Sequence, residues 1–165
     1  MAVGKNTIVR SVAPKSIFES AKDVISASVS FNQGDLLVFD DSANVLKVPA
    51  AEAEGLTFLG VARCDIVLGK LRTPYSGTAV DAAAAASDIP GPVYGVVAKC
   101  VIKTGDSINP GDLVYLDPAT GTRGVTVTGT KAIGIYQGPA VVTAAAALEI
   151  EVLIGARHPA DSLKF

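Results

Sequence analysis

Short apolar runs separated by turn-forming residues are the dominant pattern along this chain. In "NPGDLVYLD", at residues 109–117, Pro110 and Gly111 favour a turn, because proline fixes its own φ and glycine accepts a positive φ. The apolar run Leu113 to Leu116 follows at once and ends at Asp117. Because turn residues bound it on both sides, this run predicts a short β-strand.

Three further stretches have the same character. Residues 124–129, "GVTVTG", alternate and favour a hairpin, and residues 93–103 form an apolar run that predicts a longer strand. In "LEIEVLI", at residues 148–154, apolar residues alternate with Glu149 and Glu151, which predicts a closing strand with both carboxylates facing solvent. Helix-period patterning is weak throughout, so the expected fold class is all-β.

The turn-and-strand pattern occurs twice in the chain. "VISASVSFNQGDLLVFD" at residues 24–40 aligns without a gap with "VIKTGDSINPGDLVYLD" at residues 101–117, and Gly60 matches Gly134 further along each copy. We therefore expect two related units whose turn glycines occupy equivalent turns with similar backbone conformations, since glycine tolerates a positive φ. An Asp side chain commonly caps backbone N–H groups in such a turn. The residues expected to have structural roles in these turns are Gly34, Asp35, Gly111, Asp112 and Asp117.

The repeat defines a β-domain at residues 24–155. The two units are expected at residues 24–69 and 101–155, joined by a connection at residues 70–100. Alanines at residues 82–86 favour a short helix or an ordered loop, which the following Pro-Gly-Pro ends. The predicted architecture is a compact β-barrel or β-sandwich built from two related sub-units, with at most one or two short helices.

Residues 1–23 lie outside the repeat and mix apolar with basic residues. A disordered tail and an ordered arm both fit such a segment. A free arm exposes its apolar side chains, whereas an arm laid across a neighbouring subunit buries them at about 25 cal/mol per Å². We therefore predict an assembly arm that becomes ordered over an adjacent subunit, with Ile8, Val9, Val12, Ile17 and Phe18 as its apolar anchors. At the other end, residues 156–165 form a short polar tail.

Composition and charge narrow the class of protein. Hydrophobic residues make up 49% of the 165 residues and aromatics only 5%, so Val, Ile, Leu and Ala are expected to build the core. The net charge of −2 lacks the basic excess that accompanies nucleic-acid binding. The N-terminal region has no apolar stretch typical of a secretory signal, and Pro139 and glycines interrupt the uncharged residues 132–148. We therefore expect synthesis in a cytoplasm and neither nucleic acid nor a membrane as partner.

Residues able to catalyse reactions or bind metal ions are sparse. His158 is the only histidine, so a paired-histidine metal site is excluded and a Ser-His-Asp triad would depend on one residue of the tail. Cys64 and Cys100 lack metal-ligand spacing and are interpreted as small buried side chains rather than a bridge or a reactive thiol. The Asp residues lack the spacing of a calcium loop. We therefore expect no enzyme activity, no cofactor and no metal site.

Four pieces of the last third of the chain occur in a recognisable order. They are the stretch at residues 111–121, the Thr/Gly-rich hairpin at 125–129, the pair Ile133-Gly134 and the strand at 148–154. This order resembles the tailed-bacteriophage capsid cement, or decoration, proteins, in which the first piece is a G-D-x-V-Y-x-D-x-x-T-G stretch. Residues 32–62 fit the same pattern more loosely. The longer N-terminal segment and the Ala-rich connection depart from it.

The resemblance implies a compact β-domain, often trimeric, on the outside of an icosahedral head. There it would bridge neighbouring subunits of the major capsid protein, so the implied partners are that protein and further copies of this chain, and the implied location is the capsid exterior of the virion. Two alternatives stay open. One is another virion structural protein, such as a head-fibre base or a tail component, and the other is a small non-catalytic β-barrel domain of an enzyme system.

Overall fold

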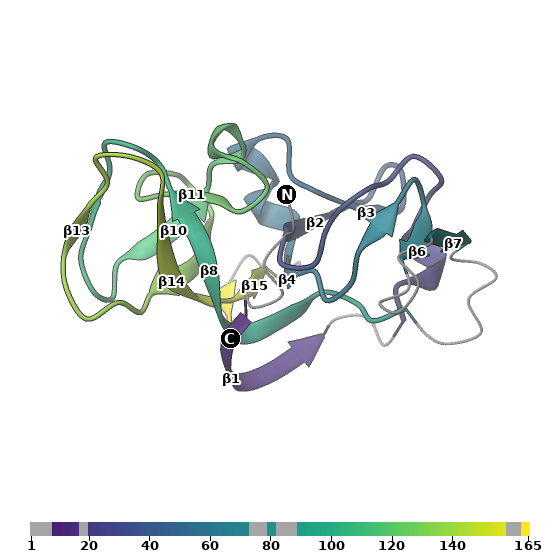
Figure 1. Cartoon of the computed structure of the whole chain (residues 1–165), viewed down its shortest axis with the longest axis horizontal. Coiled ribbons are helices and arrows are strands. Elements are labelled where there is room, and N and C mark those ends of the chain that lie inside the picture. Colours follow the sequence, from purple (N-terminus) through teal and green to yellow (C-terminus); the bar gives the residue numbers. More distant parts are fainter. Residues whose placement is uncertain (1–7, 17–19, 73–78, 82–88, 158–162) are drawn as a thin grey trace.

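The computed structural model describes residues 8–16, 20–72, 79–81, 89–157 and 163–165, and it confirms the predicted all-β class (Figure 1). The main sheet of the described residues contains β1 (Ile8–Ser16), β2 (Leu36–Asp40), β3 (Val45–Lys47), β4 (Phe58–Val61), β8 (Val93–Ile102), β10 (Leu113–Leu116), β11 (Gly124–Thr126), β12 (Ala132–Tyr136) and β14 (Leu148–Ile154).

Smaller elements surround this sheet. The first of three small sheets consists of β5 (Ile66–Val67), β6 (Lys70–Arg72) and β7 (Ala79–Asp81). The second pairs β9 (Ser107–Ile108) with β13 (Val142–Thr143), and the third pairs β15 (Ala156–Arg157) with β16 (Leu163–Lys164). The helical segments of the described residues are 3₁₀ turns, η1 (Lys22–Val24), η2 (Glu52–Thr57) and η3 (Pro118–Thr120), where the sequence predicted at most one or two short helices.

The second unit closes into a barrel. Its strands pair in the order β8–β14–β12–β10–β11, and β11 returns to β8 through a parallel pairing that sets Gly124 opposite Val101. β14 runs antiparallel to β8 along its whole length. On β14, Glu149 is exposed and Glu151 is half-buried, while Ile150, Val152 and Ile154 belong to the core of the barrel. The alternation in this strand therefore follows the pattern expected from the sequence.

The first unit has the same strand order but stays open. β3, β2 and β4 correspond to β11, β10 and β12, and β4 reaches β8 through Val61 opposite Val93. Residues 22–24 align with the last part of β8, yet they form η1 instead of a strand. As a result, β3 is an edge strand, and no further strand in the described part of the chain pairs with it to close the first unit into a ring. The first unit is an open version of the barrel formed by the second.

Strand β8 belongs to both units. In the first unit, Val93 of β8 lies opposite Val61. The equivalent pair in the second unit is Leu153 opposite Ile135. The first unit thus extends past the expected boundary at residue 69 and uses the start of β8 as its closing strand. Beyond Gly95, whose φ is +71°, β8 pairs with β14 of the second unit. A single strand therefore connects the two units covalently and through hydrogen bonds.

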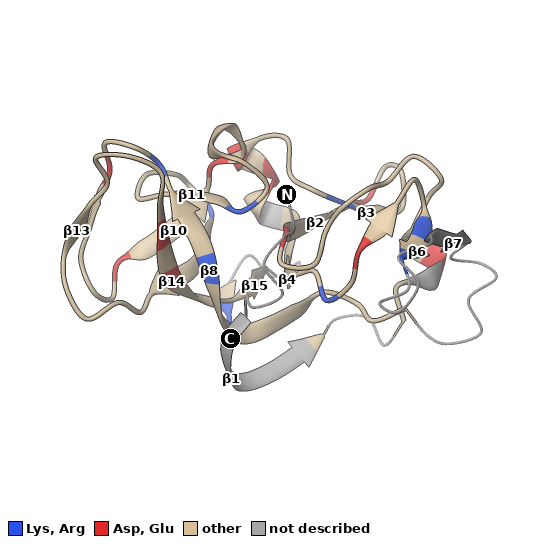
Figure 2. Ribbon diagram, in the orientation of Figure 1, with Lys and Arg blue, Asp and Glu red and all other residues tan. Residues whose placement is uncertain are grey.

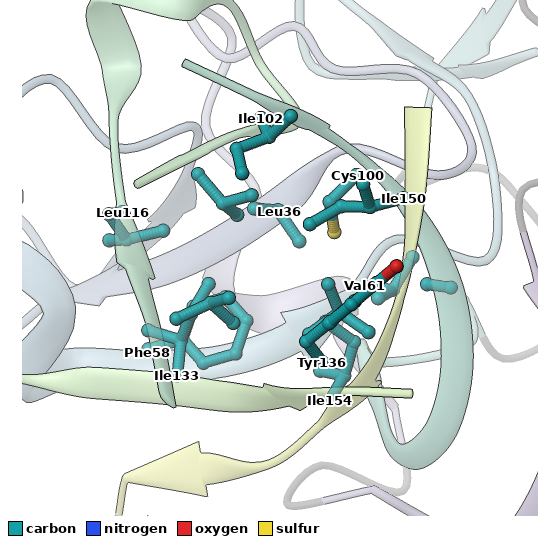
Figure 3. Close-up of a cluster of buried hydrophobic side chains, with 14 of the residues drawn as sticks. Leu36, Phe58, Val61, Cys100, Ile102, Leu116, Ile133, Tyr136, Ile150 and Ile154 are labelled. Atoms are coloured by element: carbon teal, nitrogen blue, oxygen red, sulfur yellow. The ribbon is translucent and has the colours of Figure 1, made fainter. Parts of the chain in front are cut away.

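Two hydrophobic cores lie on opposite sides of β2 and β4. Leu37 faces the core of the first unit, whereas its neighbours Leu36 and Val38 belong to the core of the second unit. Figure 3 shows this second core, in which Leu36, Phe58 and Val61 lie among the side chains of the barrel. β2 and β4 consequently contain continuous buried runs, while β10 alternates between exposed and buried residues. The outer face of the first unit thus packs against the second.

The N-terminal segment differs from the expected arm. Ile8–Ser16 forms β1, which pairs antiparallel with β8 of the same chain, and the Ser16 hydroxyl donates to the Pro92 carbonyl at 2.8 Å. The backbone groups along the edge of β8 need hydrogen-bond partners, and β1 supplies them. Contact of the arm with an adjacent subunit stays a prediction. Of the expected anchors, β1 contains Ile8, Val9 and Val12, and the described residues do not include Ile17 and Phe18.

The C-terminal segment also differs from the expected polar tail. β15 pairs with β16 to form a small hairpin that lies against β4 and β12. A Cβ atom on Gly155 would come within 2.5 Å of the Leu163 side chain, so this leucine packs directly on the glycine backbone. His158 and the alanines at residues 82–86 lie outside the described residues.

Candidate functional site

The two Gly-Asp turns have the same backbone conformation. Gly34 has a φ of +96° and Gly111 a φ of +90°. In each turn the Asp N–H donates to the carbonyl of the Asn three positions earlier, at 3.0 Å in both copies. The Asn N–H donates in return to the Asp carboxylate, at 2.7 Å for Asp35 and 2.8 Å for Asp112. Each Asp side chain therefore caps its own turn.

Each turn is also held to the same neighbouring strand. The Gly34 N–H donates to the Ala62 carbonyl at 2.9 Å, and the Gly111 N–H donates to the Tyr136 carbonyl at 3.0 Å. The N–H groups of Ala62 and Tyr136 donate back to the carbonyl of the Asp in the respective turn, both at 2.9 Å. The alignment that places Gly60 beside Gly134 thus corresponds to a matching hydrogen-bond pattern in the two units.

The two turns differ in their surroundings. Asp35 is 2% exposed, and its Oδ1 accepts a hydrogen bond from the Thr122 hydroxyl at 2.6 Å. Next to it, the Leu36 N–H donates to the Thr122 carbonyl at 3.1 Å. Asp112 instead accepts from the side-chain amide of Asn109, and the backbone and side-chain hydrogen bonds from Asn109 hold the pKa of Asp112 below its usual value. The first turn joins the two units, while the second faces outward.

A second joint connects the units through Glu52. Its Oε1 accepts hydrogen bonds from the Thr130 N–H at 2.9 Å and the Lys131 N–H at 3.3 Å. Neither this contact nor the contact of Asp35 with Thr122 could be expected from the sequence, because the partners lie 78 and 87 positions apart. No local pattern marked Thr122 or Glu52 as a joining residue.

Asp117 closes the opposite end of β10. The Thr120 hydroxyl donates to the Asp117 carboxylate, and the Asp117 N–H donates to the Gly124 carbonyl at 2.9 Å. A Cβ atom on Gly124 would lie 2.1 Å from the Asp117 carbonyl oxygen, so only glycine fits there without a backbone shift. The stretch at residues 111–121 is therefore a compact unit of turn, strand and 3₁₀ turn.

A shallow cavity of about 390 Å³ lies between η2 and the β2–β3 hairpin. Lys47 Nζ lies 3.0 Å from Asp40 Oδ2 and 2.7 Å from Glu54 Oε1, and the Ser42 hydroxyl donates to Asp40 at 2.6 Å. These groups satisfy one another, so we interpret them as a clasp that holds η2 against the hairpin. The cavity is lined by Phe39, Asp40, Asp41, Ser42, Lys47, Ala53, Glu54 and Thr57.

The clasp shifts the pKa values of its members in the directions expected for ion pairs. Hydrogen bonds from Ser42 and Lys47 hold the pKa of Asp40 well below its usual range. Burial raises the pKa of Glu54, but Lys47 and two backbone N–H groups outweigh burial and leave this pKa lowered. The pKa of Lys47 is raised by its hydrogen bonds to Glu54 and Asp40. All three groups are therefore charged near neutral pH.

The two thiols are poorly suited to nucleophilic chemistry. Burial raises the pKa of Cys64 to about 11 and that of Cys100 to about 12. The thiolate, which is the nucleophile, is therefore scarce at neutral pH. Within the described ranges, no group of three or more His, Cys, Asp or Glu side chains is placed to hold a metal ion. In the part of the chain that the structure describes, the ribbon positions of Lys, Arg, Asp and Glu are distributed over both units, with acidic and basic residues interspersed (Figure 2).

No protein-family model matches the chain, and no curated protein matches it. The helices of the described residues include none that is long and apolar enough to cross a membrane.

Proposed function

We propose that the protein is a bacteriophage capsid decoration protein, which binds the outer surface of the head and stabilises contacts between major capsid subunits. One observation carries the proposal. The four pieces that resemble this family form one continuous structure, because the Gly111 turn leads into β10, β10 pairs with β11 and β12, and β12 pairs with β14 in the closed barrel. The same topology recurs in the open first unit, which fits the internal copy of the pattern.

The use of the polar side chains supports a structural role. Asp35, Asp112 and Asp117 cap turns, Glu52 joins the two units, and Asp40 belongs to the clasp. Each of these carboxylates already accepts hydrogen bonds from the chain itself. In this proposal the protein is not an enzyme and needs no cofactor or metal ion.

Binding alone is sufficient for the proposed activity. A protein that binds assembled subunits but not separated ones stabilises the assembly, by about 2.7 kcal/mol per site when its free concentration is 100 times the Kd. Contacts repeated over a symmetric shell add together, so modest individual interfaces become collectively strong. A rigid body built from a closed barrel and two joints loses little conformational entropy on binding. The proposed partners are the major capsid protein and further copies of this chain.

Co-sedimentation tests the proposal. Purified protein is mixed with DNA-filled heads of the phage that encodes this chain, prepared without the protein, and the heads are pelleted through a sucrose cushion. We expect saturable binding at a fixed ratio to the major capsid protein, and no binding to heads of an unrelated tailed phage. Folded protein that stays in the supernatant contradicts the proposal. Binding to isolated tails in place of heads also contradicts it and favours a tail component.

A further inference from the structure

The turn between β5 and β6 has an unusual residue at its tip. Val67 pairs with Lys70 in this hairpin, so Leu68 and Gly69 make a two-residue turn. Their φ values are +48° and +74°, as expected for a type I′ turn. Such a turn favours Asn-Gly, because Asn adopts the left-handed conformation more readily than Leu does. The leucine at this position therefore strains the backbone.

Another exposed hairpin loop in the first unit follows the usual preference. The β2–β3 loop contains Asn44, which is exposed and has a φ of +53°. In the described residues, Asn44 and Leu68 are the non-glycine residues with a positive φ. Leu68 is 65% exposed, which makes it the most exposed large apolar side chain in the described part of the chain. Neither backbone preference nor burial thus explains a leucine in this turn.

A neighbouring loop holds the turn in place. The Leu68 N–H donates to the Ser30 hydroxyl at 2.9 Å, and the Gly69 N–H donates to the Val29 carbonyl at 2.8 Å. A Cβ atom on Gly69 would lie 2.6 Å from the Ala27 Cα, so residue 27 packs directly on the turn. The backbone of the turn is therefore fixed, and the leucine side chain is presented to solvent with little left to order on binding.

We propose that Leu68 is an anchor with which this chain binds the major capsid protein, by inserting into an apolar pocket on that protein. The inference rests on the proposed function and names the residue that makes the contact. Backbone strain of this kind costs the free chain stability and clusters at functional sites. An apolar side chain held ready to fill a pocket is the kind of anchor around which binding interfaces are built.

The position and chemistry of the turn favour a capsid subunit as the occupant. β6 and β7 lie near one end of the long axis of the molecule (Figure 1), so the turn beside β6 is placed to reach a neighbouring subunit, as bridging requires. A second copy of this chain is disfavoured, because the cavity beside η2 is lined by the charged clasp. A membrane is disfavoured too, since one leucine is shorter than a single acyl chain, which itself binds membranes only marginally.

Co-sedimentation of variant proteins tests the proposal. Wild type and variants are titrated onto DNA-filled heads of the phage that encodes this chain, prepared without the protein, and the pelleted fraction gives the Kd. Leu68→Asn is expected to raise the Kd by about tenfold or more, because the apolar contact is lost. Leu68→Met keeps an apolar side chain of similar volume and is expected to bind within about threefold of wild type.

Thermal melting of the free proteins supplies an independent measurement. Because Asn adopts a positive φ at lower cost, Leu68→Asn is expected to raise the melting temperature by about 2–4 °C. Weaker head binding by a more stable protein does not come from unfolding. Leu148→Asn is the matched control, since it makes the same change at a leucine that is 42% exposed in the second unit. This control is expected to bind heads like wild type.

Three results overturn the proposal. One is Leu68→Asn binding heads as tightly as wild type, and another is Leu148→Asn weakening binding as much as Leu68→Asn does. The third is a lower melting temperature of Leu68→Asn, which would show that the leucine serves the fold itself. Wild-type protein that stays in the supernatant overturns the proposed function as well, whereas the other three results leave it standing, so the two failures are distinguishable.

Discussion

Asp35 and Asp112 occupy the same position in two equivalent turns, yet only Asp35 contacts the other unit. Asp35 is 2% exposed, and its carboxylate accepts a hydrogen bond from the Thr122 hydroxyl at 2.6 Å. The Asp112 carboxylate accepts only from Asn109 in the described hydrogen bonds. A duplicated turn thus joins the two units in one copy and remains local in the other.

This difference predicts unequal costs of removing the two carboxylates. Asp35→Ala removes a turn cap and a contact between units from a buried place, so we expect a loss of about 1–3 kcal/mol in the free energy of unfolding. Asp112→Ala removes a cap on an open turn and is expected to cost about 0.5–1.5 kcal/mol. Urea unfolding measures both. A double-mutant cycle of Asp35→Ala with Thr122→Val isolates the contribution of the contact between the units. If Asp112→Ala lowers the free energy of unfolding as much as Asp35→Ala or more, Asp35 does not join the two units.

The positive φ of Gly111 predicts a backbone cost on substitution. A Cβ atom at Gly111 meets nothing within 4 Å, so Gly111→Ala changes only the backbone energy, and we expect a loss of about 1 kcal/mol. Gly105 is a matched control, because its φ is +95° and its surroundings are equally open. Gly105→Ala is expected to cost a similar amount in urea unfolding. Unchanged stability of both variants would falsify the left-handed backbone conformation of Gly105 and Gly111.

The clasp of Asp40, Lys47 and Glu54 predicts a pH-dependent contribution to stability. The pKa values of Asp40 and Glu54 are lowered in the folded chain, so their contribution is present above the ordinary carboxylate pKa and is lost as pH falls through the lowered values. The pKa of Lys47 is raised, so its contribution is present below the ordinary lysine pKa and is lost as pH rises through the raised value. The clasp therefore acts between roughly pH 5 and pH 10.

Thermal melting at low salt measures this contribution. We expect Lys47→Met to lower the melting temperature slightly at pH 7, since partly exposed ion pairs contribute little and salt screens them. The difference from wild type should shrink as the pH falls through the lowered pKa values of Glu54 and Asp40 and these carboxylates become protonated. Lys103→Met, which changes an exposed lysine of the second unit, serves as control. A Lys47→Met effect that is the same at every pH is inconsistent with the clasp.

Burial predicts slow reactions for both cysteines. With pKa values raised to about 11 for Cys64 and about 12 for Cys100, little thiolate forms at pH 8. We expect Cys100 to resist Ellman's reagent in the native protein and Cys64 to react slowly, and both to react fast in urea. Cys64→Ser separates the two signals. Rapid native labelling of this variant would show that Cys100 is accessible.

Sequence reasoning recovers the local features of this fold. The Gly-Asp turns, the strand at residues 148–154 and the long strand starting at residue 93 depend on neighbours in the chain, which composition and alternation reveal. The contact of Asp35 with Thr122 depends on residues far apart in sequence, so no local pattern predicts it. The pairing of β1 with β8 is missed for the same reason, because apolar and basic residues fit an arm as well as an edge strand.

The repeat also hides differences between its copies. Val24 aligns with Val101 of β8, but it belongs to the 3₁₀ turn η1, and the first unit stays open. Leu36 and Leu113 are identical in the alignment, yet one is buried by the other unit and one is exposed. Packing between the units decides these outcomes, and it becomes visible only once the whole chain is folded.

Heat-induced release of DNA from heads tests whether the protein stabilises the capsid. Heads of the phage that encodes this chain, prepared without the protein, are heated with and without saturating protein while a dye reports released DNA. We expect saturating protein to raise the release temperature, and we expect the increase to follow the occupancy of the protein on the heads. A release temperature that stays the same on fully occupied heads would contradict the claim that the protein stabilises the capsid.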